Sequence, residues 1–189
     1  MIRRVLLTSA AVLSFALVAP FAANAQTLFI SAGGAFPTGD DLDGVNTGLM
    51  AAGGVTFDVG GNGVWAGVEG AYARHGTDFV EDGDVTAKTY SVMGILGYSF
   101  ETAGSVDPYV WAGAGLAGAK ISDDSESFSA SGFGWQAGAG VSFGGEEAKA
   151  RPYVEGRYHS GSMEFEGDTS NTTISFFAAL VGVAIGVGN

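Results

Sequence analysis

Eight segments of the chain alternate between large apolar residues and small residues, and this alternation constrains the fold more than any other feature. A period of two residues is typical of a strand whose two faces meet different surroundings. After residue 25, no stretch has the i, i+3, i+4 apolar spacing of a helix. We therefore predict eight strands, near residues 28–36, 48–58, 63–75, 86–100, 108–121, 131–143, 152–164 and 172–188.

The two faces of these segments differ in residue size. In segment 131–143, Phe133 and Trp135 alternate with Gly134 and Gly138. In segment 172–188, the apolar positions oppose mostly small residues; these apolar positions are Phe177, Val181, Val183, Ile185 and Val187. A soluble β-sandwich or a lipocalin-like barrel also alternates, but its second face is normally rich in Lys, Glu and Thr. Here the second face is chiefly glycine, and the chain has 32 glycines in 189 residues.

Small residues suit the crowded interior of an eight-stranded barrel, whose lumen is just wide enough for side chains. The large apolar face must then point outward, where only lipid tolerates it. Outward aromatic residues also fall into two levels, as in the two aromatic girdles of membrane barrels; these are Phe57, Tyr98, Phe100 and Phe143 at one level and Tyr72, Tyr90, Phe133, Trp135 and Phe177 at the other. We predict an all-β fold, an eight-stranded antiparallel up-and-down transmembrane β-barrel.

Residues 1–25 have the pattern of a secretory signal peptide. Arg3 and Arg4 precede an apolar stretch, and Ala23-Asn24-Ala25 provides an A-x-A cleavage site. The barrel domain is then residues 26–189, exported from the cytoplasm, and we expect it in the outer membrane of a Gram-negative cell. The absence of cysteine excludes disulfides and thiolate metal sites.

The links between the predicted strands alternate between short turns and acidic loops. The acidic loops are residues 37–46, 76–85, 122–130 and 165–171, and we expect them on the outside of the cell, with both termini in the periplasm. With 20 acidic against 8 basic residues, the chain is unsuited to binding nucleic acid, which requires cations against phosphates. A ligand on a host or another surface could bind at these loops.

Three motifs resemble those of the small outer-membrane barrels related to outer-membrane protein X, the attachment-invasion proteins and the opacity proteins. The motifs are Pro108-Tyr109-Val110-Trp111-Ala112-Gly113-Ala114-Gly115, Gly134-Trp135-Gln136-Ala137-Gly138-Ala139-Gly140-Val141 and Pro152-Tyr153-Val154-Glu155-Gly156-Arg157-Tyr158. The resemblance implies a non-enzymatic protein with a structural or surface-interaction role, in adhesion or envelope protection. It also implies insertion by the outer-membrane assembly machinery, although such barrels usually end in an aromatic residue and this chain ends in Asn189.

Two other functions stay open: a soluble periplasmic barrel that binds a small apolar ligand, and a barrel enzyme that modifies lipid A. Barrel deacylases carry a His and a Ser two residues apart on one strand, whereas here Ser160 directly follows His159 and falls on the opposite face. Residues Asp40, Asp41, Asp43, Glu81, Asp82 and Asp84 do not match the calcium-loop pattern. We expect no catalytic residues, no metal and no cofactor. A pore is also disfavoured, because eight strands leave no water channel.

Charged residues of inward parity lie on opposite sides of the predicted barrel. Glu69 on the third strand and Arg157 on the seventh are expected at similar heights, and Glu155 shares the face of Arg157. We predict that Arg157 pairs with both carboxylates and closes the lumen, because an unpaired buried charge is costly.

Three cations of outward parity lie near the loop ends of consecutive strands: Arg74, Lys88 and Lys120. At the membrane interface a lipid-facing cation costs little, and Arg and Lys are natural partners of phosphate. We expect this rim to bind lipopolysaccharide phosphates among the outer-membrane lipids and so to set the depth of the barrel. The alternative is snorkelling, in which the cations only reach water.

Overall fold

The computed structural model describes residues 26–38, 45–77, 86–100, 102, 104–122, 127–144, 148–165 and 171–187. All eight expected strands are present, with bounds within a few residues of those predicted. They are β1 (Gln26–Thr38), β2 (Val45–Asp58), β3 (Val64–Thr77), β4 (Thr86–Ser99), β5 (Val106–Ser122), β6 (Ser127–Phe143), β7 (Ala150–Phe165) and β8 (Asn171–Gly186). The predicted signal peptide and the centres of the acidic loops lie outside the described residues.

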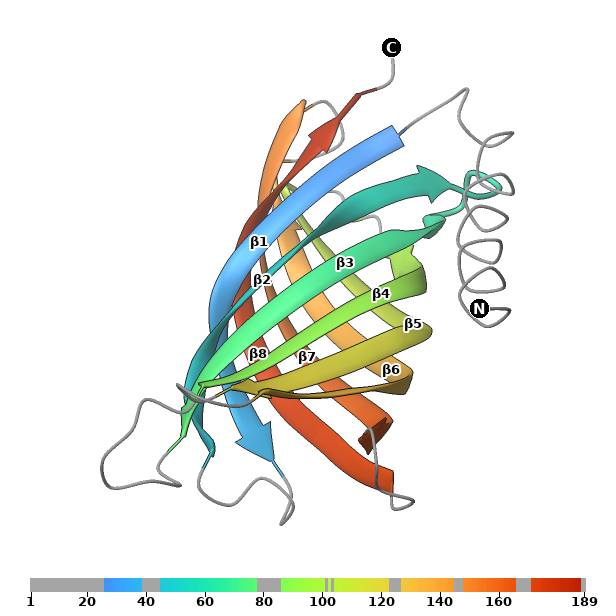
Figure 1. Ribbon diagram of the computed structural model, residues 1–189. Helices are drawn as coiled ribbons and strands as arrows, with labels where there is room; N and C mark the ends of the chain where they lie inside the picture. Colours follow the sequence, from blue (N-terminus) through green and yellow to red (C-terminus); the bar gives the residue numbers. More distant parts are fainter. Residues whose placement is uncertain are drawn as a thin grey trace.

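The strands form one closed antiparallel barrel in sequence order (Figure 1). β1 closes the sheet by pairing with β8, from Thr27 opposite Gly186 to Thr38 opposite Ser175. Closure leaves no sheet edge, so the backbone groups are satisfied between strands as lipid requires. Among the described residues, no helix is long and apolar enough to cross a membrane. The predicted fold class is confirmed.

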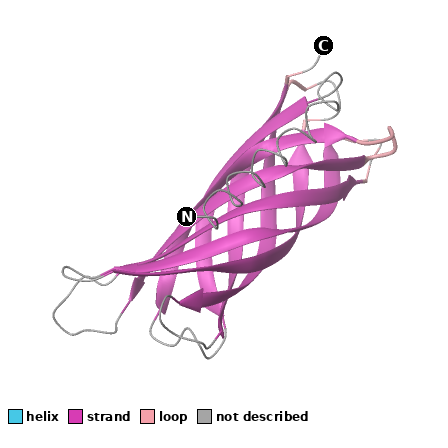
Figure 2. Cartoon of the chain, turned by 45° about the vertical axis from the view of Figure 1, so that its right-hand side comes forward, coloured by secondary structure: helices cyan, strands magenta, loops and turns pink. Residues whose placement is uncertain are grey.

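The strands run at an angle to the axis of the barrel (Figure 2). Their lengths range from 13 residues in β1 to 17 residues in β5 and β6. A tilted strand needs about 9–11 residues to cross the hydrocarbon core, so all eight are long enough. The outer wall is apolar: Ile30, Leu116 and Val181 are each more than 60% exposed. Of the nine aromatic residues assigned to the outer face, eight are exposed, whereas Phe57 is buried although its register, opposite Ala66, is outward.

The lumen is filled by larger side chains than we predicted. On β8, Ile174, Phe176 and Leu180 are buried beside small inward residues such as Ala178, so the inner face of this strand also carries large side chains that we did not predict. The fully buried side chains also include Met93 and Met163. The interior of an eight-stranded barrel must be packed to close density, and glycine and alanine alone cannot fill it.

Many inward glycines make room for aromatic side chains of the neighbouring strand. Four inward aromatic residues each stand directly opposite a glycine in the sheet: Trp65 opposite Gly97, Tyr109 opposite Gly140, Trp111 opposite Gly138, and Tyr153 opposite Gly182. A Cβ on Gly138 would lie 2.6 Å from Trp111 Nε1, closer than real Cβ atoms come to other heavy atoms. The glycine content therefore complements the aromatic residues in the lumen instead of replacing them.

Candidate functional site

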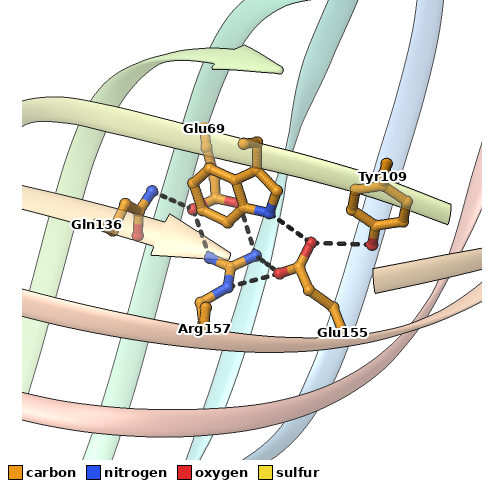
Figure 3. A network of polar contacts seen from close by, with 6 residues as sticks. Glu69, Tyr109, Gln136, Glu155 and Arg157 are labelled. Atoms are coloured by element: carbon orange, nitrogen blue, oxygen red, sulfur yellow. Dashed lines mark hydrogen bonds and ion pairs between the residues drawn. The ribbon is translucent and has the colours of Figure 1, made fainter. Parts of the chain in front are cut away.

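The centre of the lumen holds a buried network built around Arg157 of β7 (Figure 3). The guanidinium donates from Nη1 to Glu69 Oε1 at 2.6 Å and from Nη2 to Glu69 Oε2 at 2.9 Å. It also donates from Nε to Glu155 Oε1 at 2.7 Å. The side chains of all three residues are at most 5% exposed. Arg157 thus forms ion pairs with both carboxylates.

Strand geometry explains how the three residues meet. Glu155 and Arg157 are two residues apart on β7, so their side chains leave the strand on the same face. Glu69 comes from β3, which is not hydrogen-bonded to β7 in the sheet. Closure of the barrel places β3 across the lumen from β7, and the long Arg157 side chain spans the distance.

Three further residues, which we did not predict from the sequence as members, complete the network. Trp111 Nε1 and Tyr109 Oη both donate to Glu155 Oε2, at 2.8 Å and 2.9 Å. Gln136 Nε2 donates to Glu69 Oε1 at 2.8 Å. Inward parity on β5 and β6 was the available signal, but we used all three residues only as parts of the motifs that carry the family resemblance.

The network contains two carboxylates and one guanidinium, which leaves one excess negative charge in a buried layer. Neutral donors from Tyr109, Trp111 and Gln136 compensate this charge. The guanidinium carbon of Arg157 also lies 4.7 Å from the centroid of the Trp111 ring, within cation–π range. A charge buried in this way is stable only when hydrogen bonds satisfy its remaining acceptor sites, as they do here.

The lumen differs on the two sides of this network. Toward the short turns there is a cavity of about 130 Å³, lined partly by Trp65, Tyr153 and Arg151. Toward the acidic loops the lumen is packed with buried apolar side chains, among them Met50, Met163, Ile174 and Phe176. The charged layer and these side chains fill the middle and the loop half of the lumen.

Two buried histidines lie next to the Phe176 ring in the loop half of the lumen. The His159 ring stacks on Phe176 with centroids 4.8 Å apart, and the His75 ring lies 5.8 Å from it. His75 Nδ1 is 3.2 Å from the carbonyl oxygen of Asn46, and His159 Nδ1 has no hydrogen-bond partner in the described part of the chain. Ser160 bonds instead with Ser175, its partner on β8. Among the described residues, no hydrogen bond joins a histidine to a serine.

Arg74, Lys88 and Lys120 form a continuous row on the outer wall. Arg74 stands opposite Lys88 in the pairing of β3 with β4, and Lys88 stands opposite Lys120 in the pairing of β4 with β5. Within the described part of the chain, the ion pairs all involve Arg157, so this row has no carboxylate partner there. The acidic residues considered as calcium ligands lie outside the described residues. Among the residues that the structure does describe, no group of three or more His, Asp or Glu side chains is placed to hold a metal ion.

A closed eight-stranded antiparallel barrel with an apolar outer wall and a filled lumen belongs to the class of transmembrane barrels found in the outer membrane of Gram-negative bacteria. The chain is a member of the family described as Outer membrane protein beta-barrel domain, whose sequence profile matches residues 8–147. The family places the protein in the outer membrane and excludes the soluble periplasmic alternative. No match was found among curated proteins.

Several solved structures share the fold at low sequence identity. Neisserial surface protein A superposes with a TM-score of 0.65 and 18% identity, covering 86% of this chain and 98% of that one. OprG from Pseudomonas aeruginosa gives 0.56 and 15%, covering 89% and 99%. The attachment invasion locus protein of Yersinia pestis, Ail, gives 0.51 and 18%, covering 87% and 99%. At these identities the likeness establishes the fold alone.

Proposed function

We propose that this protein is a closed, non-enzymatic outer-membrane barrel that displays its acidic loops at the cell surface, in adhesion or protection of the envelope. The observation that carries the proposal is the obstructed lumen. A barrel that neither conducts nor catalyses acts through the surfaces that it presents, and these are the loops and the lipid-facing wall. In this proposal the assembly machinery inserts the chain with both termini in the periplasm, as an even number of strands requires.

The centre of the lumen argues against a pore. Ion pairs join Arg157 to Glu69 across the barrel and to Glu155 on its own strand, and Trp111 packs against the guanidinium. A steady ion path would require this buried layer to come apart, which leaves charges uncompensated. The buried apolar side chains on the loop side, such as Met163 and Phe176, add a second obstruction, because hydrocarbon side chains offer an ion no ligands.

The histidines argue against a lipid A-modifying enzyme. A Ser–His mechanism needs the serine hydroxyl within hydrogen-bond reach of the imidazole. His159 points into the lumen and is 2% exposed, whereas Ser160 is bonded to Ser175. His75 is 3% exposed and contacts a backbone carbonyl. Neither ring is placed to activate a hydroxyl on the lipid-facing wall.

The loop role is tested by neutralising loop charge in cells that express the protein in their outer membrane. The variant replaces five aspartates by Asn and one glutamate by Gln; the positions are Asp40, Asp41, Asp43, Asp82 and Asp84, and Glu81. The control replaces Glu146 and Glu147 by Gln on the periplasmic side. We expect the wild type and the control to raise attachment to host-cell layers or survival in serum, and the loop variant to lose the gain. A wild type without any gain in either assay contradicts the proposal.

Two measurements separate the alternatives. Purified protein in a planar bilayer is expected to show no steady ion conductance, and a steady conductance would favour a pore. Mass spectra of lipid A from expressing and non-expressing cells are expected to be identical, and a lost or added acyl chain would favour an enzyme.

A further inference from the structure

The outer wall carries an apolar groove that crosses five strands, from β8 through β1, β2 and β3 to β4. Its floor consists of small outward residues, Ala32, Ala51, Gly53 and Gly70, and its volume is about 920 Å³. Larger residues stand at its two ends. These are Ile30, Val181 and Val183 at the end formed by β1 and β8, and Tyr72, Tyr90 and Val92 at the end formed by β3 and β4. The groove is thus a shallow recess in a wall that is otherwise built of protruding apolar side chains.

The strand register places this groove directly beside the cation row. Tyr72 stands opposite Tyr90, and two residues further along β3 and toward the start of β4, Arg74 stands opposite Lys88. Two residues along a strand correspond to about 6.6 Å. Lys120 extends the row on β5, where the next outward residue away from the loops is Gly118, opposite Tyr90. The cations therefore lie at the loop end of the groove, with the two tyrosines between.

The cation row lacks compensation in the described protein. Like charges directly opposite each other in a sheet are destabilising, and here three stand side by side. Arg74 and Lys120 are exposed, and the described ion pairs leave all three cations without a carboxylate. A phosphate group suits such a row, because its oxygens accept charge-assisted hydrogen bonds from several cations at once.

We propose that the groove and the cation row together bind one phosphorylated, acylated lipid of the outer leaflet, lipopolysaccharide. Its phosphate lies on Arg74, Lys88 and Lys120, and one acyl chain passes Tyr72 and Tyr90 into the groove. The inference rests on the proposed function only in taking the loop end as the outer side of the membrane. It adds a binding site for one acyl chain to the phosphate contacts of the cation row.

A second copy of the chain is a poorer occupant of the groove. A two-fold symmetric contact brings the same patch of both molecules together. The cation rows of the two copies would then approach each other without a described carboxylate to separate them. An unbranched acyl chain fills a shallow apolar recess without this repulsion, and its own phosphate supplies the missing negative charge.

The test measures lipid retained by the protein after extraction from outer membranes in mild detergent. One variant fills the groove by Gly70→Leu, because a Cβ at Gly70 meets only carbonyl oxygens at 3.9 Å and 4.0 Å. Its control is Gly94→Leu, outward on β4 but outside the groove, where a Cβ meets one carbonyl oxygen at 3.9 Å. A second variant replaces Arg74, Lys88 and Lys120 by Gln, with Lys149→Gln at the turn end as control. Heat-modifiable gel migration verifies that each barrel is folded.

We expect the wild type and both controls to retain lipopolysaccharide, quantified by mass spectrometry. The triple Gln variant is expected to lose at least about tenfold, because three cations that attract the anionic phosphate are neutralised. Gly70→Leu is expected to lose about tenfold, because several methylene groups of the acyl chain are no longer buried. Equal retention in all variants overturns the proposal and leaves only snorkelling. Loss in the triple variant with normal retention in Gly70→Leu overturns the acyl site.

Two further outcomes distinguish a failure of the lipid site from a failure of the proposed function. Retention of phospholipid instead of lipopolysaccharide, with the same dependence on the variants, places the groove in the inner leaflet and contradicts the orientation in the proposed function. A cross-linked dimer that disappears in Gly70→Leu makes a second copy the occupant and overturns the lipid site while leaving the proposed function intact.

Discussion

Arg157 and Glu69 are joined by two parallel hydrogen bonds, of 2.6 Å and 2.9 Å, across the lumen between strands that are not neighbours in the sheet. Neighbouring strands are already held by the backbone ladder, so a side-chain tie between them adds little to the shape of the barrel. A tie between β3 and β7 instead links opposite walls. The pair therefore couples the closure of the lumen to the stability of the whole barrel.

Truncating Arg157 is expected to destabilise the protein strongly. Arg157→Ala leaves Glu69 and Glu155 buried without a cation, and breaking a buried pair in this way costs about 3–5 kcal/mol. Urea unfolding in detergent micelles measures the loss. Arg151→Ala is the control, since Arg151 lies on the same strand without a described ion pair and is expected to change stability by less than about 1 kcal/mol. Equal stability of wild type and Arg157→Ala would show that the network contributes nothing.

Removing all three charges together is expected to restore most of that loss. In the variant Glu69→Gln/Glu155→Gln/Arg157→Met the buried charge is gone, and the amide carbonyl introduced at position 155 can still accept from Trp111 and Tyr109. Replacing a complete buried ion cluster by neutral groups is often neutral or stabilising. Urea unfolding measures the stability of the triple variant against that of Arg157→Ala. A triple variant less stable than Arg157→Ala would mean that the stability lost in Arg157→Ala comes from packing and not from uncompensated charge.

Adding a methyl group at Gly138 is expected to disturb the network from outside it. The new Cβ would lie 2.6 Å from Trp111 Nε1, so the indole must move and its hydrogen bond to Glu155 must lengthen. Overpacking of this kind costs about 1–3 kcal/mol. Gly156→Ala is the matched control, because nothing lies within 4 Å of a Cβ there. Trp fluorescence and the unfolding midpoint report the change. Equal effects of both substitutions would show that the close packing of Trp111 against Gly138 is not required.

Replacing His159 by Phe is expected to leave stability unchanged or to raise it by about 1 kcal/mol. The aromatic stack on Phe176 is kept, while Nδ1, which lacks a partner, is removed. A buried polar group without a hydrogen bond costs about 1–3 kcal/mol, partly offset here by the larger ring. Thermal unfolding in micelles measures the difference. A loss of more than about 1 kcal/mol would indicate that the imidazole makes a polar interaction that stabilises the fold.

Protease added to intact cells is expected to cut, if anywhere, at residues 37–46, 76–85, 122–130 or 165–171. These links join the strands at the end opposite the two termini, which the even strand number assigns to the periplasm. Mass spectrometry of released fragments locates the cuts, and permeabilised cells serve as the control for the turn side. Cleavage confined to residues 59–63 or 144–151 in intact cells would reverse the orientation.

The sequence by itself determined the strands and the face of each residue. Side-chain direction in a strand follows parity, which is a local property. The eight segments, the outward phase of Arg74, Lys88 and Lys120 and the inward phase of Glu69, Glu155 and Arg157 could therefore be read from the chain.

Only the tertiary structure decided which inward residues meet. Parity marked Tyr109, Trp111 and Gln136 as inward but not as partners of the carboxylates, and the large residues Phe176 and Leu180 were overlooked on β8. Contacts across a lumen depend on the stagger and radius of the closed barrel, which arise from all eight strand pairings together. The groove has the same origin, because its lining is assembled from the register of five strands and no single segment contains it.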